Sequence, residues 1–585
     1  MGARVTEREW AAQVEALCQL TYSRANGLRR GGTVGATISR TRQRLEQSSE
    51  EIDMSKHLRG AALATIIFAL VGHNPATLAQ DTRQAPYVAG ADTKTVQIGD
   101  IVPPKVAAPC APAACPFKGQ TVTVLVTGGR PIRGAILEVQ EEYEAATGAK
   151  LNVVSLMLDE HFVSVISDGT RKAGKYDVSM AGAWWLGELV GGNFLLSYDR
   201  FYGDPRFPKW DIDDVLPAPR SLLSYGKHKY MVALDHDGQV MYYRRDLLED
   251  PAHRTAFARR YGYPLDVPKT WEQFRAVAEY FNGKDLNGDG IADHGLTLPL
   301  QIGGQSMFNF INFSAPYVLG PSDRNSYWFD PASMKPLIEG PGHQKAMQDF
   351  VALIPLGPRE MLTWDLGASW DHFLQGRAAV TFTWGDLGAL AQQEGSRVKG
   401  RIGSAPLPGT NEYYSRARQA WIKTPSINRV GNTVGGSWAG VISRYSKVPE
   451  AAYYLLALMA TKEKSLVYAA RGWDGIDPGR RSQFLPPHGT AHIDDYVRLG
   501  WNAADARDYS AAYAETFSNP LQIPYLRIPG AFSYWQALDV HLREAAAGHL
   551  SAPEALKATA VAFEEITVRL GRAKQGQSYR TSLEK

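Results

Sequence analysis

The stretch from residue 121 to residue 181 alternates strand-like and helix-like patterns, and it constrains the fold more than any other part of the chain. Three segments rich in residues that favour strands are 121–126, 150–156 and 176–180. Two segments with helical patterns lie between them, at 132–147 and 159–171. Such alternation is typical of α/β proteins whose sheet is largely parallel.

Two indoles follow the third predicted strand directly, in the sequence Ala181-Gly182-Ala183-Trp184-Trp185. In α/β sheets, ligands bind outside the carboxyl ends of the strands. The sequence therefore places Trp184 and Trp185 at an edge where flat rings could face a ligand, although packing in the core is the alternative for each.

The chain has 585 residues, which is enough for at least two domains, because single cores stop growing near 250–300 residues. Hydrophobic residues make up 44% and charged residues 21%, an ordinary globular composition. A formal net charge of +3 gives no electrostatic basis for binding nucleic acid, so no nucleic-acid partner is expected.

Residues 54–79 match a secretory signal peptide. A basic region with Lys56, His57 and Arg59 precedes an apolar run at 61–72, and small residues follow. The run is too short to span a membrane. Residues 1–53 are expected to be an upstream extension or non-native start, with a cytosolic leader as the alternative. The chain is therefore expected to be exported to the periplasm.

Residues 80–117 form a predicted linker rich in Pro and Ala. It contains Cys110 and Cys115, separated by four residues. An oxidising compartment would allow the two thiols to pair as a local staple. A metal site is a weaker interpretation, because no second pair of Cys or His accompanies them.

Residues 230–248 contain two short apolar pieces separated by Asp235-His236-Asp237-Gly238. This pattern fits a β-hairpin with a polar bend. It equally fits a crossing of the chain from one lobe to another, with polar side chains facing a cleft. The residues alone leave both open.

Residues 285–293 place oxygen ligands at alternating positions around glycines, as in calcium-binding loops. The predicted ligands of a structural Ca²⁺ are Asp285, Asn287, Asp289, the carbonyl of Ile291, and Asp293. The bidentate Glu that would complete the motif is replaced by Leu296. An acidic turn without metal is the alternative, and no catalytic cofactor is expected.

An enzyme would have to rely on carboxylates far apart in the chain. The sequence lacks a complete serine-hydrolase elbow, an H-E-x-x-H motif and a phosphate loop. A glycoside hydrolase would need a pair of carboxylates, and the candidates are Asp235, Asp237, Asp386 and Asp474. We favour the alternative that these groups bond hydroxyls of a ligand or cap loops.

Five segments, in order along the chain, resemble the sugar-type extracellular solute-binding proteins (family 1) of bacterial ABC importers. They are Y-D-V-S-M-A-G-A-W-W-L-G-E-L-V-G-G-N-F-L-L-S-Y-D at 176–199, the stretch 230–248, V-P-K-T-W-E-Q-F at 267–274, the segment 379–387, and G-G-S-W-A-G-V-I-S-R-Y-S-K-V-P-E-A-A at 435–452. The tail at 563–579 resembles one subgroup of that family.

The resemblance implies an α/β, two-lobed periplasmic-binding-protein fold (type II-like), with hinge crossings and a cleft between discontinuous lobes. It places lobe 1 at 118–236 plus about 437–480, and lobe 2 at 237–436 plus about 481–585. It further implies a monomer without catalytic activity that captures a solute such as a sugar or polyol and delivers it to the transmembrane permease subunits of an ABC importer.

Carried over by position, the resemblance implies a set of ligand-binding residues. They are Trp184, Trp185, Asp235, His236, Trp384, Asp386, Trp438, Trp473 and Asp474. For each tryptophan, packing in the core is the alternative, and for His236 a structural role is. This chain has Phe382-Thr383-Trp384 where the family often has Gly-Pro-Trp, so the identity of the ligand stays open.

Overall fold

The structure is a computed structural model of the chain, and it describes residues 110, 115–127, 133–303, 306–472 and 475–583. All of these belong to the unit Pro86–Lys585. The predicted extension, the signal peptide and most of the linker lie outside the described residues. Within the described residues, no helix is long and apolar enough to cross a membrane.

The first sheet has the strand order β2-β1-β3-β14-β4, with β7 also paired to β14. Its strands are β1 (Thr121–Thr127), β2 (Lys150–Leu156), β3 (Val178–Ala181), β4 (Leu195–Leu196), β7 (Val232–Ala233) and β14 (Ala439–Ser443). β1 pairs in parallel with β2 and β3, whereas β14 is antiparallel to β3. The three strands expected at the start of the folded chain therefore form the parallel part of this sheet.

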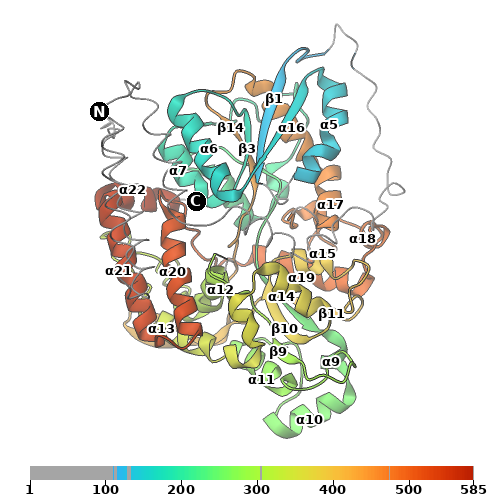
Figure 1. The fold of residues 1–585 in the computed structure, drawn as a ribbon, viewed down its shortest axis with the longest axis vertical. Coiled ribbons are helices and arrows are strands. Elements are labelled where there is room, and N and C mark those ends of the chain that lie inside the picture. The colour runs from blue at the N-terminus through green and yellow to red at the C-terminus, as the bar shows by residue number, and fades with distance from the viewer. Residues whose placement is uncertain (1–109, 111–114, 128–132, 304–305, 473–474, 584–585) are drawn as a thin grey trace, which may run out of the picture. The chain divides into compact units, whose positions relative to one another are not determined.

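Helices cover the first sheet (Figure 1). They include α5 (Arg133–Thr147), α6 (Leu158–Arg171) and α16 (Pro449–Met459), while α7 (Leu186–Gly191) follows β3 in the chain and α17 (Lys462–Arg471) packs on α16. α6 contacts β1 and β2, while α16 contacts β14 and α5. The apolar face of α5 is buried through Ile136, Val139 and Tyr143, as the helical spacing of these residues predicts.

The second sheet has the order β11-β8-β10-β9. Its strands are β8 (Val240–Arg244), β9 (His294–Leu296), β10 (Ala378–Thr383) and β11 (Ile402–Ala405). The helices α11 (Trp271–Phe281), α14 (Leu366–Leu374) and α19 (Ala503–Ser518) pack on it. The α11 helix begins at the predicted N-cap, because Thr270 Oγ1 accepts a hydrogen bond from the Gln273 N–H at 3.2 Å.

The remaining elements connect or extend these layers. The strands of two small antiparallel sheets are β5 (Ser224–Tyr225) with β6 (His228–Lys229), and β12 (Thr410–Ser415) with β13 (Ala420–Asn428). The other α-helices are α8 (Pro217–Arg220), α9 (Arg245–Glu249), α10 (Pro251–Tyr261), α12 (Ser306–Val318), α13 (Pro341–Val351), α15 (Asp386–Leu390), α18 (Ile493–Arg498), α20 (Ala531–Ala546), α21 (Ala552–Leu570) and α22 (Arg572–Leu583). Short 3₁₀ helices are η3 (Ala183–Trp185), η4 (Ile212–Asp214), η5 (Ser221–Leu223), η6 (Ile354–Leu356), η7 (Arg359–Thr363) and η8 (Arg481–Gln483).

The stretch 230–248 is a crossing between the two sheets and not a hairpin. β7 pairs with β14 in the first sheet, whereas β8 pairs with β10 and β11 in the second. The polar residues between β7 and β8 therefore lie where the chain leaves one sheet for the other. The chain returns to the first sheet between β13 and β14.

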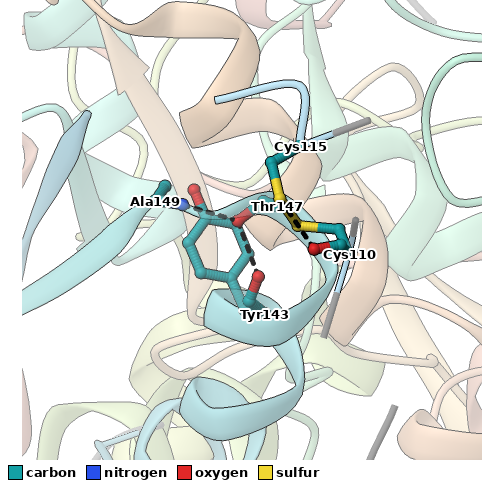
Figure 2. The surroundings of a disulfide bond; sticks show 5 residues. All are labelled: Cys110, Cys115, Tyr143, Thr147 and Ala149. Atoms are coloured by element: carbon teal, nitrogen blue, oxygen red, sulfur yellow. Dashed lines mark hydrogen bonds between the residues drawn. A yellow bond between two sulfur atoms is a disulfide. The ribbon is translucent and has the colours of Figure 1, made fainter. Parts of the chain in front are cut away.

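Cys110 and Cys115 form a disulfide, with their Cα atoms 5.3 Å apart, and the predicted staple is confirmed (Figure 2). The bridge lies beside the end of α5. The Cys110 N–H donates to the Ala145 carbonyl at 2.8 Å, and the Thr147 hydroxyl donates to the Tyr143 carbonyl at 2.6 Å. The staple thus fixes the end of the linker to the first helix of the folded body.

Candidate functional site

Asp235 joins the first crossing to the segment that leads into β14. The Asp235 N–H donates to the Trp438 carbonyl, and the Trp438 N–H donates to Asp235 Oδ2, both at 3.0 Å. Asp237 accepts from the Ser437 N–H at 2.6 Å. Two crossings that are about two hundred residues apart in the sequence are therefore held side by side by carboxylates.

Glycine is needed where this second crossing passes the carboxylate. Gly435 has φ +153°, and a Cβ there would lie 2.3 Å from Trp384 Nε1 and 2.6 Å from Asp237 Cβ. The following Ser437 has φ +41°, in the left-handed region that side chains other than glycine rarely adopt. The backbone is thus held in a demanding conformation at the carboxylates, as is common at functional sites.

A third segment brings in Asp477, which lies between α17 and η8. Its N–H donates to Asp235 Oδ1 at 2.9 Å. Its Oδ2 accepts from the Gly385 N–H at 2.9 Å and from the Tyr513 hydroxyl at 3.1 Å. Oxygen atoms of Asp235, Asp237 and Asp477 all lie within 4.8 Å of one another. We call these three residues the carboxylate cluster.

The carboxylate cluster is buried and carries no compensating positive charge. Asp235 is 2% exposed, Asp237 8% and Asp477 1%. Burial, followed by repulsion from the neighbouring carboxylates, raises the pKa of Asp235 and of Asp477 well above the usual value; burial raises that of Asp237. Within the part of the chain that the structure describes, no Lys, Arg or His forms an ion pair with any of the three.

Trp384 and Asp386 follow β10 and lie next to the carboxylate cluster. The Trp384 ring N–H donates to the Val434 carbonyl at 3.1 Å, and its side chain is buried. Asp386 is partly buried; burial and the charge of Asp237 raise its pKa. The structure therefore brings the segment 384–386 to the same place as the two crossings.

The predicted tryptophans of the first lobe form one aromatic group with Trp438. Trp184 and Trp438 have ring centroids 5.4 Å apart, and Trp185 lies 5.8 Å from Trp438. Trp185 also packs against His161 and Phe162, at 5.1 and 5.0 Å. Trp184 and Trp185 are buried, whereas Trp438 is only partly buried. Of the three rings, Trp438 is the one with surface left for a ligand.

His236 is 1% exposed, and its ring lies against Gly479, where a Cβ would come within 2.2 Å of the ring. Burial, followed by the charge of Arg480, lowers the pKa of His236 to about 3, so the ring is neutral at physiological pH. Its Nε2 has no hydrogen-bond partner among the described residues. These contacts support the structural role more than a charged contact with a ligand.

Several residues of this region are absent from the sequence-based set: Asp477, Tyr509, Tyr513 and Tyr525. The Tyr513 hydroxyl also donates to the Gly238 carbonyl at 2.7 Å, and the Tyr525 hydroxyl donates to the Gly435 carbonyl. Asp477 and Tyr525 follow no strand and no motif, and the helical spacing of Tyr509 and Tyr513 predicts only that they pack in a core. The predicted Trp473 and Asp474 lie outside the described residues.

Side-chain amides extend the polar network from the crossing into α12. The Gln239 N–H donates to Asn432 Oδ1 at 2.7 Å, and Asn432 returns a bond to the Gln239 carbonyl at 3.0 Å. Asn312 donates to Gln239 Oε1 at 2.8 Å, and Gln239 donates to Asn309 at 3.3 Å. A buried, mutually bonded network of this kind fixes the orientation of the crossing.

In the predicted calcium loop, residues 285–293, the acidic side chains bond to groups of the chain itself. Asp285 accepts from the backbone N–H groups of Asn287, Gly288 and Gly290, which lower its pKa. Asp289 pairs with Arg377 at 2.7 Å. Two other predicted ligands also have contacts within the chain: Asn287 Oδ1 accepts from the Asp289 N–H, and Asp293 accepts from the Leu286 N–H.

The two sheets, joined by crossings that meet at buried polar groups, define the class of two-lobed binding proteins. The chain belongs to the bacterial extracellular solute-binding protein family, whose profile matches residues 130–465. A curated relative is a probable amino-acid ABC transporter periplasmic-binding protein of Sinorhizobium fredii. It is 24% identical over 346 residues, which cover 56% of this chain and 74% of the relative.

Solved structures confirm the fold. A solute-binding protein of Agrobacterium radiobacter in complex with ribitol has a TM-score of 0.58 at 19% identity, covering 77% of this chain and 100% of its own. MalE3 of T. maritima with maltose has 0.57 at 19%, covering 76% and 99%. A protein of Agrobacterium vitis with D-mannitol has 0.56 at 20%, covering 77% and 99%. The family consists of binding proteins, and the glycoside hydrolase alternative finds no support.

Proposed function

We propose that this chain is the periplasmic solute-binding component of an ABC importer and that it captures a sugar or polyol between its two lobes. The observation behind this proposal is that the two crossings and the segment at Asp477 meet at buried carboxylates beside Trp438. Carboxylates there accept from hydroxyl groups, and an aromatic face stacks on the apolar face of a sugar ring. Ribitol, maltose and D-mannitol in the similar structures support this class of solute.

A solute with a free carboxylate fits the site less well. Recognition of a carboxylate favours an Arg whose guanidinium donates in a bidentate fashion. The cluster instead presents carboxylates without any ion pair among the described residues. The amino-acid assignment of the Sinorhizobium relative therefore makes amino acids the second class to screen, after neutral polyhydroxylated solutes.

Capture requires the two sheets to separate and close again, because the cluster is buried. Hinge motion at the crossings would expose Asp235, Asp386 and Trp438, and a solute that contacts both lobes would favour the closed state. We propose the lobe boundaries given by the resemblance, near residues 236, 436 and 480. We further propose an exported monomer that docks on permease subunits, with the signal peptide at 54–79.

The proposed ligand contacts are Asp235, Asp386, Trp384 and Trp438, with Trp184 and Trp185 supporting them and Trp473 and Asp474 outside the described residues. A Ca²⁺ in the loop 285–293 stays a prediction, since its carboxylates have partners within the chain. Calcium there would have to displace Arg377 from Asp289.

A thermal-shift and calorimetric screen against sugars, polyols and amino acids tests the function. We expect saturable stabilisation by one sugar or polyol without turnover. Trp438→Ala should weaken that binding by about 1–2 kcal/mol, roughly 5- to 30-fold, through lost stacking. The matched control is Trp421→Ala, because Trp421 is 37% exposed in β13, away from the crossings. Product formation from a glycoside, or equal effects of both variants, would contradict the proposal.

A further inference from the structure

The carboxylate cluster is assembled from two segments that the fold brings together, and three acidic groups share one small volume. Asp235 and Asp237 come from the crossing between β7 and β8, and Asp477 comes from the segment after α17. Their oxygens lie within 4.8 Å of one another, and all three side chains are more than nine-tenths buried. Among the described residues, this is the only group of three or more His, Cys, Asp or Glu side chains with such geometry.

The partners of these carboxylates leave their negative charge in place. Asp235 accepts from the N–H groups of Asp477 and Trp438, and Asp237 from that of Ser437. Neutral donors of this kind stabilise a carboxylate, but they add no positive charge. Like charges a few ångströms apart in a medium of low dielectric repel strongly, so the cluster requires either bound protons or a cation.

Asp477 Oδ1 and the Tyr509 hydroxyl are buried and have no partner among the described residues, as is also true of His236 Nε2. A Cβ on Gly385 would lie 2.3 Å from the first and 2.5 Å from the second, so both atoms pack against the Gly385 backbone and lie close to each other. Tyr509 is 1% exposed. Burial of an unpartnered oxygen is unfavourable, and the two atoms together indicate a ligand that accepts lone pairs.

The donor set selects the class of that ligand. It consists of oxygen atoms alone, from carboxylates and a phenol, without a thiolate or an imidazole. Such a set suits hard cations, which take six to eight oxygen ligands in the case of Ca²⁺, and it does not suit Zn²⁺ or copper. Asp386 directly follows Gly385, whose N–H donates to Asp477, and adds a fourth carboxylate nearby.

We propose that Asp235, Asp237 and Asp477 hold a hard cation of the Ca²⁺ class where the crossings between the two sheets meet. The Tyr509 hydroxyl and water complete its coordination. The cation neutralises the cluster and ties the segment at 477 to the first crossing. Because Asp477 also accepts from Gly385 and Tyr513, this residue connects the cation to the segment after β10 and to α19. Asp235 is also one of the proposed solute contacts, so the cation site adjoins the solute site and rests on the proposed function at that residue.

The test uses the purified full chain. Its bound metals are first measured by mass spectrometry, and it is then stripped with a chelator under mild denaturation and refolded. Ca²⁺ and Mg²⁺ are titrated calorimetrically, and Tb³⁺ is titrated by luminescence excited through tryptophan. We expect one saturable site per chain that is sensitised by the nearby Trp384 and Trp438. Asp477→Asn should weaken Ca²⁺ binding by roughly 100-fold, since loss of a direct ligand exceeds the 10–100-fold effect of supporting partners.

The matched control is Asp289→Asn in the loop 285–293, which should leave this site unchanged. Asp237→Asn is the second cluster variant, and circular dichroism shows whether each variant folds without metal. The proposal is overturned if the stripped chain binds none of the three ions, or if Asp289→Asn removes all binding while both cluster variants retain it. Sugar binding is measured on the same samples, so a failure of the cation site is distinguished from a failure of solute capture.

Discussion

Two acidic regions of the molecule differ in how their carboxylates are satisfied. The loop 285–293 has its oxygen ligands at alternating positions within nine consecutive residues. The carboxylate cluster takes its three carboxylates from positions 235, 237 and 477. In the loop, Asp285 accepts from three backbone N–H groups and Asp289 pairs with Arg377. In the cluster, no ion pair compensates the charge among the described residues, and Asp477 Oδ1 has no partner.

The difference has a local cause. Asp and Asn at alternating positions in a tight turn reach the N–H groups two or three residues ahead, so a short acidic loop satisfies its own side chains. Carboxylates on separate crossings have backbone donors fixed by the fold and little freedom to find others. The loop 285–293 is easily recognised in the sequence, yet its carboxylates already have donors within the chain. The carboxylate cluster has no such sequence motif, and its charge is the one without a compensating cation among the described residues.

The largest expected contrast comes from adding one methyl group to a glycine in each region. Gly385→Ala would place a Cβ 2.3 Å from Asp477 Oδ1 and 2.6 Å from Asp477 Cγ, and both the carboxylate and Tyr509 are held in a buried site. We expect the free energy of unfolding to fall by about 3 kcal/mol. Urea unfolding measures this loss.

Gly290→Ala is the matched variant in the loop. Gly290 has φ +81° and nothing within 4 Å of its Cβ position, so the change introduces only the strain of a left-handed backbone, about 1 kcal/mol. Equal losses for the two variants would show that the cluster is loose enough to move aside.

Much of the fold follows from local patterns in the sequence. The apolar segments at 121–126 and 150–156 become β1 and β2, and the start of α11 at Thr270 follows from its capping residues. The hairpin and crossing alternatives for 230–248 could not be separated locally, because the pairing of β7 with β14 joins residues about two hundred positions apart. Sequence separation of that size leaves no periodic signal.

The sequence predicted only part of the candidate site, because several of its residues come together from distant parts of the chain. Asp235 and Trp438 were placed by their crossings, and the structure joins them by two hydrogen bonds. Asp477 lies in a stretch that reads as an irregular loop, and Tyr509 and Tyr513 lie on α19, where they look like core residues. Their contribution depends on how α19 packs against the second sheet, which no short segment encodes.

Replacing one carboxylate by an amide should change the free energy of unfolding in opposite directions in the two regions. In chelator at neutral pH, Asp237→Asn removes a buried carboxyl whose pKa burial raises to about 7, and it still offers an acceptor to the Ser437 N–H. We expect the free energy of unfolding to rise by about 1–3 kcal/mol. Asp289→Asn instead removes a surface ion pair, so the same quantity should fall by about 0.5 kcal/mol.

Urea unfolding of both variants and of the parent chain measures whether the free energy of unfolding rises in the first and falls in the second. A loss of stability in Asp237→Asn as large as that in Asp289→Asn would mean that the charges of the cluster are compensated in the absence of a cation, and the contrast between the regions would fail.

The smallest change in the free energy of unfolding is expected for Arg377→Ala, which removes the guanidinium that pairs with the carboxylates of the loop. The guanidinium lies 2.7 Å from Asp289 and 3.7 Å from Asp293, and its side chain is about one-third exposed, so loss of the pairs should lower the free energy of unfolding by no more than about 0.5 kcal/mol. If Arg377 takes the place that a metal would fill, the variant should gain stabilisation by Ca²⁺ in a thermal-shift titration. Asp289→Asn in the same background should remove that gain. A parent chain that already shows calcium stabilisation abolished by Asp289→Asn alone would instead establish the loop as a metal site, because the carboxylates then release Arg377 and their backbone partners without help.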